Sequence, residues 1–381
     1  SNNYAVKYDE TKEKFGRDDL IPLWIADMDF KAADPIINAL QERAMQGIYG
    51  YTSRPIEYFE AIKKWQLEKN NWEVDTSLMS HALGVLPMLA NLMHTFLEKG
   101  DKVIIQPPVF HEFKNVIEAW GGEVVTNQLI ENNGRYYIDF DDLRNKAKQG
   151  AKFMIVCNPH NPVGRVWTED ELKRLGDICI KHNVLIVSDE IHADFVWKGH
   201  THKVFADLGE SYAEHCIVCT APSKTFNMAG LQASAIVIPN PALREAFRGN
   251  IAKTRLPSMN VFAGVALEAA WKHCEYYAIE VMEYIAANID HTIEFFRENT
   301  PKIKMRRPEG TYLGWVDISG LGLSVAEGER FIIERAKIAA DLGAWFGPGG
   351  EKYVRFNFAC HRSTLDKALA QLKAAYDREF A

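Results

Sequence analysis

Two carboxylic acids and a histidine follow a short aliphatic run near the middle of the chain. The run Val184–Val187 leads through Ser188 into Asp189, Glu190 and His192. Because an unpaired charge is costly to bury, such side chains at the end of an apolar strand must either reach solvent or serve a ligand. The simpler interpretation is the start of a loop, and the alternative is the rim of an active site.

A lysine stands in a comparable position further along the chain. Lys224 follows Ser223, shortly after the apolar segment Cys216–Thr220. Most lysines are merely solvated, but a lysine held in a pocket can form a Schiff base with an aldehyde cofactor such as pyridoxal phosphate. The acid and the amine therefore become candidates for one site if the fold brings them together.

Short aliphatic runs that alternate with amphipathic segments indicate how the fold would position these residues. The amphipathic segment Thr168–His182 opens with a threonine cap and early acids, which predicts a helix. Strands that are apolar throughout and separated by helices predict an α/β fold whose large, mostly parallel central sheet is flanked by helices. The predicted strands are Lys102–Gln106, Lys152–Cys157, Asn183–Ser188, Cys216–Thr220 and Ala233–Ile238.

The polar clusters of the chain come directly after four of these strands. The clusters are PPVF, NPHNPVG, SDEIH and APSK. Because ligands of open α/β sheets bind beyond the carboxyl ends of the strands, the four clusters favour an active site over four unrelated loops.

The pattern changes after about residue 259, which predicts a second, smaller α+β unit. Helices are expected over roughly 263–298, with weaker strands at Lys302–Arg306, Thr311–Asp317 and Tyr353–Asn357. We predict an N-terminal arm over residues 1–45 that packs with this unit, a large cofactor-binding domain over 46–275, and the small domain over 276–381.

Composition and charge limit the classes of partner. The 381 residues include 44 basic and 51 acidic side chains, and the net charge of −7 argues against nucleic acid or an anionic membrane as partner. No apolar stretch approaches the roughly 20 residues of a membrane helix, and the polar N-terminus lacks the apolar core of a signal peptide. We therefore expect a cytoplasmic protein that acts on a small molecule.

The cysteines and the paired histidines predict neither a disulfide framework nor a metal site. Six cysteines are sparse for a chain of this length. Cys216 and Cys219 form a CxxC sequence, but on a strand these two thiols would point to opposite faces. His200 and His202 lie in a segment that looks like a loop and lacks further ligands.

Around Lys224, in the segment APSKTFNMAGL, the chain resembles a known family. It is similar to the fold-type-I pyridoxal phosphate enzymes of the class I/II aminotransferase superfamily, and more narrowly to the MalY/PatB-type cystathionine β-lyases, which are carbon–sulfur lyases. The resemblance extends from PLWIADMDF near the start to YVRFNFA near the end, and Trp24–Phe30 (WIADMDF) is the string most specific to the subgroup. It implies pyridoxal 5'-phosphate as cofactor and a homodimer.

The resemblance also implies roles at the cofactor ring. Lys224 would form the Schiff base, and Asp189 would hold the pyridine nitrogen protonated so that the ring accepts electrons. Asn161, 28 residues before Asp189, would donate a hydrogen bond to the phenolic oxygen. Phe110 would stack on the ring, unless it is an ordinary core phenylalanine. His192 falls where relatives place a polar residue beside the ring.

At the phosphate, the resemblance implies backbone donors where an apolar helix begins. Tyr51 would reach the phosphate of the neighbouring subunit and is counted with Lys224 and Asp189 as catalytic. Many relatives carry an arginine eight residues after the lysine to pair with the phosphate, whereas this chain has Gln232. The other residues expected at the phosphate are Gly84, Val85, Leu86 and Ser223.

At the substrate, Arg355 would bind the α-carboxylate with its planar guanidinium, and Ala26 and Asn161 would lie beside that carboxylate. Glu190 and Asp194 have the simpler interpretation of structural salt bridges.

We therefore interpret the chain as a pyridoxal phosphate-dependent carbon–sulfur β-lyase. It would cleave L-cystathionine and related cysteine S-conjugates to a thiol, pyruvate and ammonia. Homocysteine would be the thiol from cystathionine. An aminotransferase on the same scaffold is the nearest alternative, and a non-catalytic regulatory protein is the alternative from another class. The complete set of site residues argues against the latter.

Overall fold

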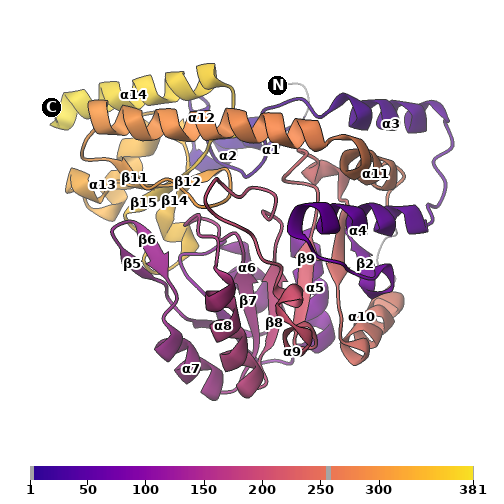
Figure 1. Cartoon of the computed structure of the whole chain (residues 1–381). Coiled ribbons are helices and arrows are strands. Elements are labelled where there is room, and N and C mark those ends of the chain that lie inside the picture. Colours follow the sequence, from indigo (N-terminus) through magenta and orange to yellow (C-terminus); the bar gives the residue numbers. More distant parts are fainter. Residues whose placement is uncertain (1–3, 255–258, 381) are drawn as a thin grey trace.

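The computed structural model describes residues 4–254 and 259–380. Figure 1 shows a large sheet with its helices in the lower part of the molecule and a group of C-terminal helices and strands, orange to yellow, above it. Among all the described residues, no helix is both long enough and apolar enough to cross a membrane.

Seven strands form the large sheet in the order β2-β10-β9-β8-β7-β3-β4. β10 runs antiparallel to both of its neighbours, and all the other pairs are parallel. The predicted mostly parallel sheet is therefore confirmed. The strands are β2 (Met79–Ala82), β3 (Lys102–Ile105), β4 (Glu123–Thr126), β7 (Ala151–Cys157), β8 (Leu185–Asp189), β9 (Cys216–Thr220) and β10 (Ser234–Val237).

The five inner strands of this sheet are those predicted from the sequence, and the two outer strands were not predicted. β2 and β4 lie at opposite edges of the sheet and are short and partly polar, with the sequences MSHA and EVVT. Edge strands pack on fewer neighbours than central strands do, so their sequences need not be apolar throughout. The long apolar runs that identify central strands are absent from them.

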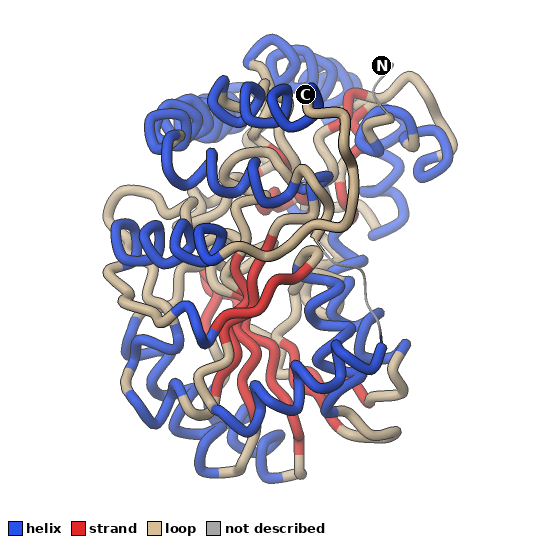
Figure 2. Tube along the Cα trace, turned by 90° about the vertical axis from the view of Figure 1, so that its right-hand side faces the viewer, coloured by secondary structure: helices blue, strands red, loops and turns tan. Residues whose placement is uncertain are grey.

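Helices cover both faces of the large sheet, as Figure 2 shows. Alternate residues of β9 show the two faces: Cys216 and Val218 belong to one apolar cluster, and Ile217 and Cys219 to the other. The two thiols of the CxxC sequence thus point to opposite faces, as predicted, and all six cysteines are free and buried. Helices α4 (Ile56–Asn70), α7 (Phe140–Lys148), α8 (Glu169–Lys181) and α11 (Ala263–His273) contribute to the first cluster, and α5 (Val85–Phe96), α6 (Glu112–Ala119) and α10 (Pro241–Thr254) contribute to the second.

Local sequence signals account for the ends of several of these helices. At the start of α8, Thr168 and Glu171 form a reciprocal capping box, so the predicted helix begins where its threonine cap indicated. α5 begins after Gly84, whose φ of +129° is a backbone conformation that glycine adopts readily.

A four-stranded antiparallel sheet with the order β11-β12-β15-β14 forms the upper part of the molecule. Its strands are β11 (Lys304–Met305), β12 (Leu313–Asp317), β14 (Asp341–Leu342) and β15 (Tyr353–Asn357). The long helices α12 (Glu275–Asn299) and α14 (Arg362–Phe380) lie across the top of Figure 1, with α13 (Val325–Arg330) beside the sheet.

The N-terminal segment reaches this upper part through a parallel strand pair. β1 (Ile21–Pro22) pairs with β13 (Ile338–Ala339). The division of the chain at residues 45/46 and 275/276 stays our proposal. The remaining α-helices and β-strands are α1 (Val6–Asp9), α2 (Thr11–Phe15), α3 (Asp34–Met45), α9 (Glu210–Ala213) and the hairpin β5 (Ile130–Asn132) and β6 (Arg135–Tyr137).

Candidate active site

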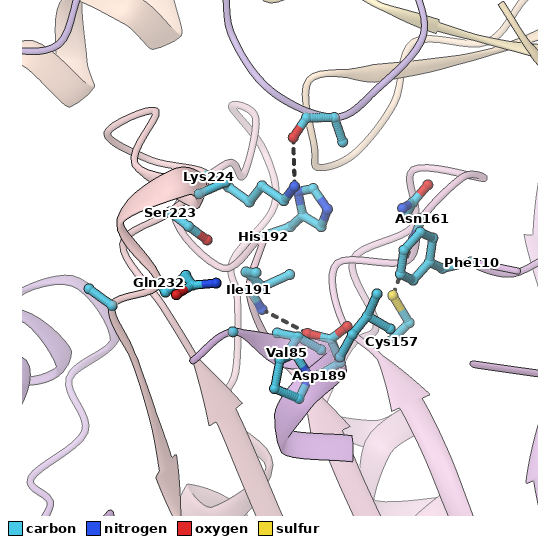
Figure 3. A pocket seen from close by; sticks show the side chains of 16 residues that line it. Val85, Phe110, Cys157, Asn161, Asp189, Ile191, His192, Ser223, Lys224 and Gln232 are labelled. Carbon is cyan, nitrogen blue, oxygen red and sulfur yellow. Dashed lines mark hydrogen bonds between the residues drawn. The ribbon is translucent and has the colours of Figure 1, made fainter. Parts of the chain in front are cut away.

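The sheet order explains how the four polar clusters meet. β9, β8, β7 and β3 are consecutive neighbours, so their carboxyl ends lie side by side at one edge. A cavity of about 240 Å³ opens there, and Figure 3 shows the side chains around it. It is lined by Ala26, Gly84, Val85, Leu86, Pro87, Phe110, Cys157, Asn161, Asp189, Ile191, His192, Ser223, Lys224, Ala229, Gln232 and Ala233.

Asp189 is the last residue of β8 and brings a buried carboxylate to this cavity. Its Oδ1 accepts a hydrogen bond from the backbone N–H of Ile191 at 3.2 Å. Burial raises the pKa of the Asp189 carboxyl to about 7, because the anion is poorly solvated there. No lysine, arginine or histidine of the described residues forms an ion pair with it at contact distance, so a cationic group of a ligand would stabilise the charged form.

Lys224 follows β9 and brings an amine to the same cavity. Burial, followed by the positive charge of Arg355, lowers the pKa of the Lys224 amine to about 8. Its Nζ donates a hydrogen bond to the carbonyl oxygen of Ala26 at 2.6 Å, and the Tyr312 hydroxyl donates to the same oxygen at 2.8 Å. The contact of Ala26 is thus made by its backbone, which orients the lysine.

His192 lines the cavity as a neutral imidazole. Burial holds the pKa of its ring well below the usual value, and the charges of Lys224 and Arg355 lower it further. Its Nδ1 is buried and has no hydrogen-bond partner among the described residues, and its ring meets the Tyr312 ring edge-on at 5.8 Å. The ring therefore keeps an unused polar atom beside Lys224.

Asn161 connects the cavity to an arginine from the upper sheet. Arg355, on β15, does not line the cavity itself. Its Nη1 donates to Asn161 Oδ1 at 2.9 Å, which leaves the Nδ2 group of the amide as the side that can donate. The backbone N–H of Phe110 donates to the Asn161 carbonyl at 3.1 Å, so the aromatic ring and the amide are held together.

The start of α5 supplies hydrogen-bond donors at another wall of the cavity. The first N–H groups of a helix lack intrahelical partners, and here Val85 and Leu86 occupy the first turn while Pro87 has no N–H. Ser223 and Gln232 also line the cavity. Within its described lining, Lys224 is the one lysine or arginine, so an anionic group there would be bound mainly by backbone dipoles.

One predicted site residue does not join the others. Tyr51 is fully exposed, at 106% of the reference accessibility, on the segment between α3 and α4, and it does not line the cavity of its own chain. The remaining predicted residues line the cavity, except Arg355, which touches it through Asn161. Their roles stay proposals.

Glu190 and Asp194 do not line this cavity and have structural partners instead. The Glu190 carboxylate pairs with the His202 ring at 2.9 Å and accepts hydrogen bonds from Ser188 and from the backbone of Phe205. Asp194 accepts hydrogen bonds from Thr225 Oγ1 at 2.5 Å and from the Trp65 indole at 3.0 Å. Glu190 thus has an acid–histidine contact, whereas Asp194 forms hydrogen bonds to neutral groups.

Two polar residues next to the site were not predicted from the sequence. Tyr312 is fully buried beside Lys224 and His192, and Asp341 forms a buried ion pair with Arg355. Neither follows a strand of the large sheet, so the signal that marked the other residues does not apply to them.

The residues around the cavity fit pyridoxal phosphate. Lys224 would hold the aldehyde carbon, the buried and unpaired Asp189 carboxylate would face the pyridine nitrogen, and Phe110 would lie against the ring. The donors at the start of α5 would bind the phosphate. The raised pKa of Asp189 supports this fit, because a protonated ring nitrogen is the cation that its carboxylate lacks.

Comparison with known proteins agrees with this geometry. Residues 18–372 match the profile of the aminotransferase class I and II family. The chain belongs to this family. Its sequence is 40% identical to cystathionine β-lyase PatB of Bacillus subtilis over 372 residues, which cover 97% of this chain and 96% of that protein. The resemblance to the MalY/PatB-type enzymes is thereby confirmed.

Two similar solved structures extend the comparison to three dimensions. Cystalysin from Treponema denticola, which contains pyridoxal 5'-phosphate, aligns with a TM-score of 0.96 at 35% identity and covers 99% of this chain and 97% of its own. The pyridoxal phosphate-bound C–S lyase from Staphylococcus hominis aligns with a TM-score of 0.91 at 32% identity, over 98% and 96% of the two chains. The predicted fold type is confirmed.

Proposed function

We propose that this protein is a pyridoxal phosphate-dependent carbon–sulfur β-lyase that cleaves L-cystathionine and related cysteine S-conjugates. The observation that carries the proposal is the convergence of the buried groups of Lys224 and Asp189 on one cavity, in a chain 40% identical to a cystathionine β-lyase. The products are a thiol, pyruvate and ammonia, and cystathionine yields homocysteine as the thiol.

When bound, pyridoxal phosphate supplies an electron sink for the electrons of the substrate Cα–H bond. Lys224 removes this proton, because burial keeps a larger share of its amine neutral near pH 7 than an exposed lysine would have. With the cofactor bound, Asp189 would hold the pyridine nitrogen protonated by accepting its hydrogen bond. Arg355 binds the substrate α-carboxylate and so orients the Cα hydrogen toward Lys224 Nζ.

The elimination breaks two bonds of the substrate. The Cα proton goes to Lys224, and the electron pair of the Cβ–S bond leaves with the thiolate. The unsaturated three-carbon amine that remains reacts with water to give pyruvate and ammonia. Atoms and charge balance without an oxidant, a reductant or a second substrate.

An aminotransferase is the second candidate, and the family profile favours it. It would use the same residues, but the Cβ–S bond would stay intact and the amino group would be transferred to the cofactor. Relatives named as lyases support the first candidate over this one.

The test is incubation with L-cystathionine in the absence of a keto acid. A lyase releases pyruvate, ammonia and a free thiol continuously, with the cofactor acting catalytically. An aminotransferase stops after one turnover and resumes when a keto acid is added, and this result would refute the lyase proposal. A Lys224→Ala variant serves as the control for cofactor-dependent but non-enzymatic cleavage.

We further propose a homodimer in which Tyr51 of each subunit reaches the phosphate site of the other. Tyr51 lies in an apolar surface that its own chain leaves uncovered in the described residues. The other exposed side chains of this surface run from the end of α3 to the start of α4: Met45, Ile48, Tyr49 and Ile56. A second copy would bury them and complete the site.

We also propose a cytoplasmic location, since the six cysteines are free thiols.

A further inference from the structure

The upper sheet holds Arg355 through a cross-strand neighbour. Asp341 on β14 lies directly opposite Arg355 on β15 in the antiparallel register. Residues directly opposite one another in such a pair place their side chains on the same face of the sheet. The Asp341 carboxylate forms an ion pair with Nη2 of Arg355, and the two side chains are only 5% and 4% exposed. The strand register therefore builds this pair.

The other contacts of Arg355 show which N–H group of its guanidinium has no hydrogen-bond partner among the described residues. Nη1 donates to Asn161 Oδ1, and the guanidinium carbon lies 5.2 Å from the centre of the Phe346 ring. Nε is buried and has no hydrogen-bond partner among the described residues. A planar guanidinium that is fixed at both Nη atoms and keeps a buried N–H donor is prepared for one more acceptor, as a substrate carboxylate would provide.

We propose that Asp341 is a positioning residue, which fixes the Arg355 guanidinium for the substrate carboxylate and offsets its positive charge within the site. The inference rests on the proposed role of Arg355. Asp341 acts through Arg355, and the hydrogen bond from Arg355 to Asn161 extends its influence to the cavity wall. A buried arginine without a compensating anion would be both costly and free to reorient.

By offsetting the charge of Arg355, Asp341 should also affect the pKa of the Lys224 amine. Arg355 lowers the pKa of the Lys224 amine, second only to burial. With the Asp341 charge removed, the field of Arg355 at Lys224 is no longer partly cancelled, and the pKa of Lys224 should fall further. The other groups that face Lys224 are the neutral His192, the carboxylates of Asp27 and Asp189, which raise this pKa, and the ammonium of Lys7, which lowers it.

The experiment uses the cofactor-loaded enzyme with Asp341→Asn, which keeps the shape of the side chain and removes its charge. We expect KM for L-cystathionine to rise about tenfold or more, the effect of one lost charge-assisted hydrogen bond, while kcat changes far less. The absorbance titration of the cofactor bound at Lys224 should move to lower pH. This spectroscopic readout does not depend on turnover.

The Asp341→Glu variant separates the positioning of the Arg355 guanidinium from the offset of its charge. It also provides a test of the proposal if Asp341→Asn does not fold. It restores the charge but displaces the carboxylate, so the titration should return toward wild type while KM stays raised. The matched control is Glu309→Gln, which removes the carboxylate partner of another buried arginine, Arg165, away from the cavity. Glu309→Gln should lower the thermal stability of the protein and leave both KM for L-cystathionine and the pH of the absorbance titration unchanged.

Two results would overturn the inference. One is a folded Asp341→Asn enzyme with unchanged KM and unchanged titration. The other is a lowered KM, which would mean that Asp341 merely repels the substrate carboxylate. Failure of the wild type to release pyruvate from cystathionine would instead refute the proposed function, and the titration would still test Asp341.

Discussion

Replacement of Asp189 by asparagine should stabilise the cofactor-free protein and abolish catalysis in the same variant. The Asp189 carboxylate is buried at the end of β8 and receives one hydrogen bond, from the backbone of Ile191. Asparagine has nearly the same shape and carries no charge. The cofactor-free protein thus loses a poorly solvated anion, whereas the enzyme loses the group that we propose keeps the pyridine nitrogen protonated.

The magnitude follows from the pKa of Asp189. Burial raises this pKa from 3.8 to about 7, a change of about three units, which corresponds to about 4 kcal/mol against the anion. Because the folded protein holds the proton more strongly than the unfolded chain does, the free energy of unfolding falls as the pH rises from about 4 to 7, and the full penalty is present above that range. The Asp189→Asn variant does not bury an anion, so it should be more stable by this amount minus the cost of burying an amide.

Denaturant unfolding of the cofactor-free proteins at pH 5 and pH 8 measures this effect. Asp189→Asn should be more stable than the wild type, and the difference should be larger at pH 8. Asp29→Asn is the matched control: Asp29 accepts a hydrogen bond from Lys7 at 3.1 Å, so its loss should destabilise the protein at both pH values. Pyruvate release by the cofactor-loaded Asp189→Asn enzyme should fall by several orders of magnitude.

The reasoning would be refuted if cofactor-free Asp189→Asn were no more stable than the wild type at pH 8. In that case the carboxylate would be solvated or paired in solution. Activity within a few-fold of the wild type would separately remove Asp189 from the mechanism.

Three further predictions concern the other proposed site residues. Lys224→Ala should fold but lose the borohydride-reducible bond to the cofactor, whereas Lys203→Ala should keep it; a reducible bond in Lys224→Ala would identify another lysine as the anchor. Arg355→Ala should raise KM for the amino acid by roughly 10- to 100-fold, the effect of losing a charge-assisted hydrogen bond, and unchanged kinetics would place the carboxylate elsewhere. Mixing inactive Lys224→Ala with an inactive Tyr51 variant should restore activity through heterodimers with one intact site, and no recovery after confirmed subunit exchange would exclude a composite site.

The sequence by itself determined the five inner strands of the large sheet and most of the residues that line the cavity at their ends. Apolar runs bounded by polar clusters identified the inner strands, and parallel strands necessarily bring their carboxyl ends to one edge. Asp189, Asn161 and Lys224 therefore met at one cavity as expected. The threonine cap of α8 was also predictable from the sequence, because capping depends on residues within one helical turn.

Tertiary structure alone decided how the upper sheet holds Arg355. The pairing of Asp341 with Arg355 depends on the register of two strands, and the contact of Arg355 with Asn161 joins residues 194 positions apart. The pKa values of Asp189 and Lys224 depend on burial by the whole molecule. Local patterns encode the elements because their hydrogen bonds and caps are local, whereas register, burial and charge compensation arise from contacts between distant segments.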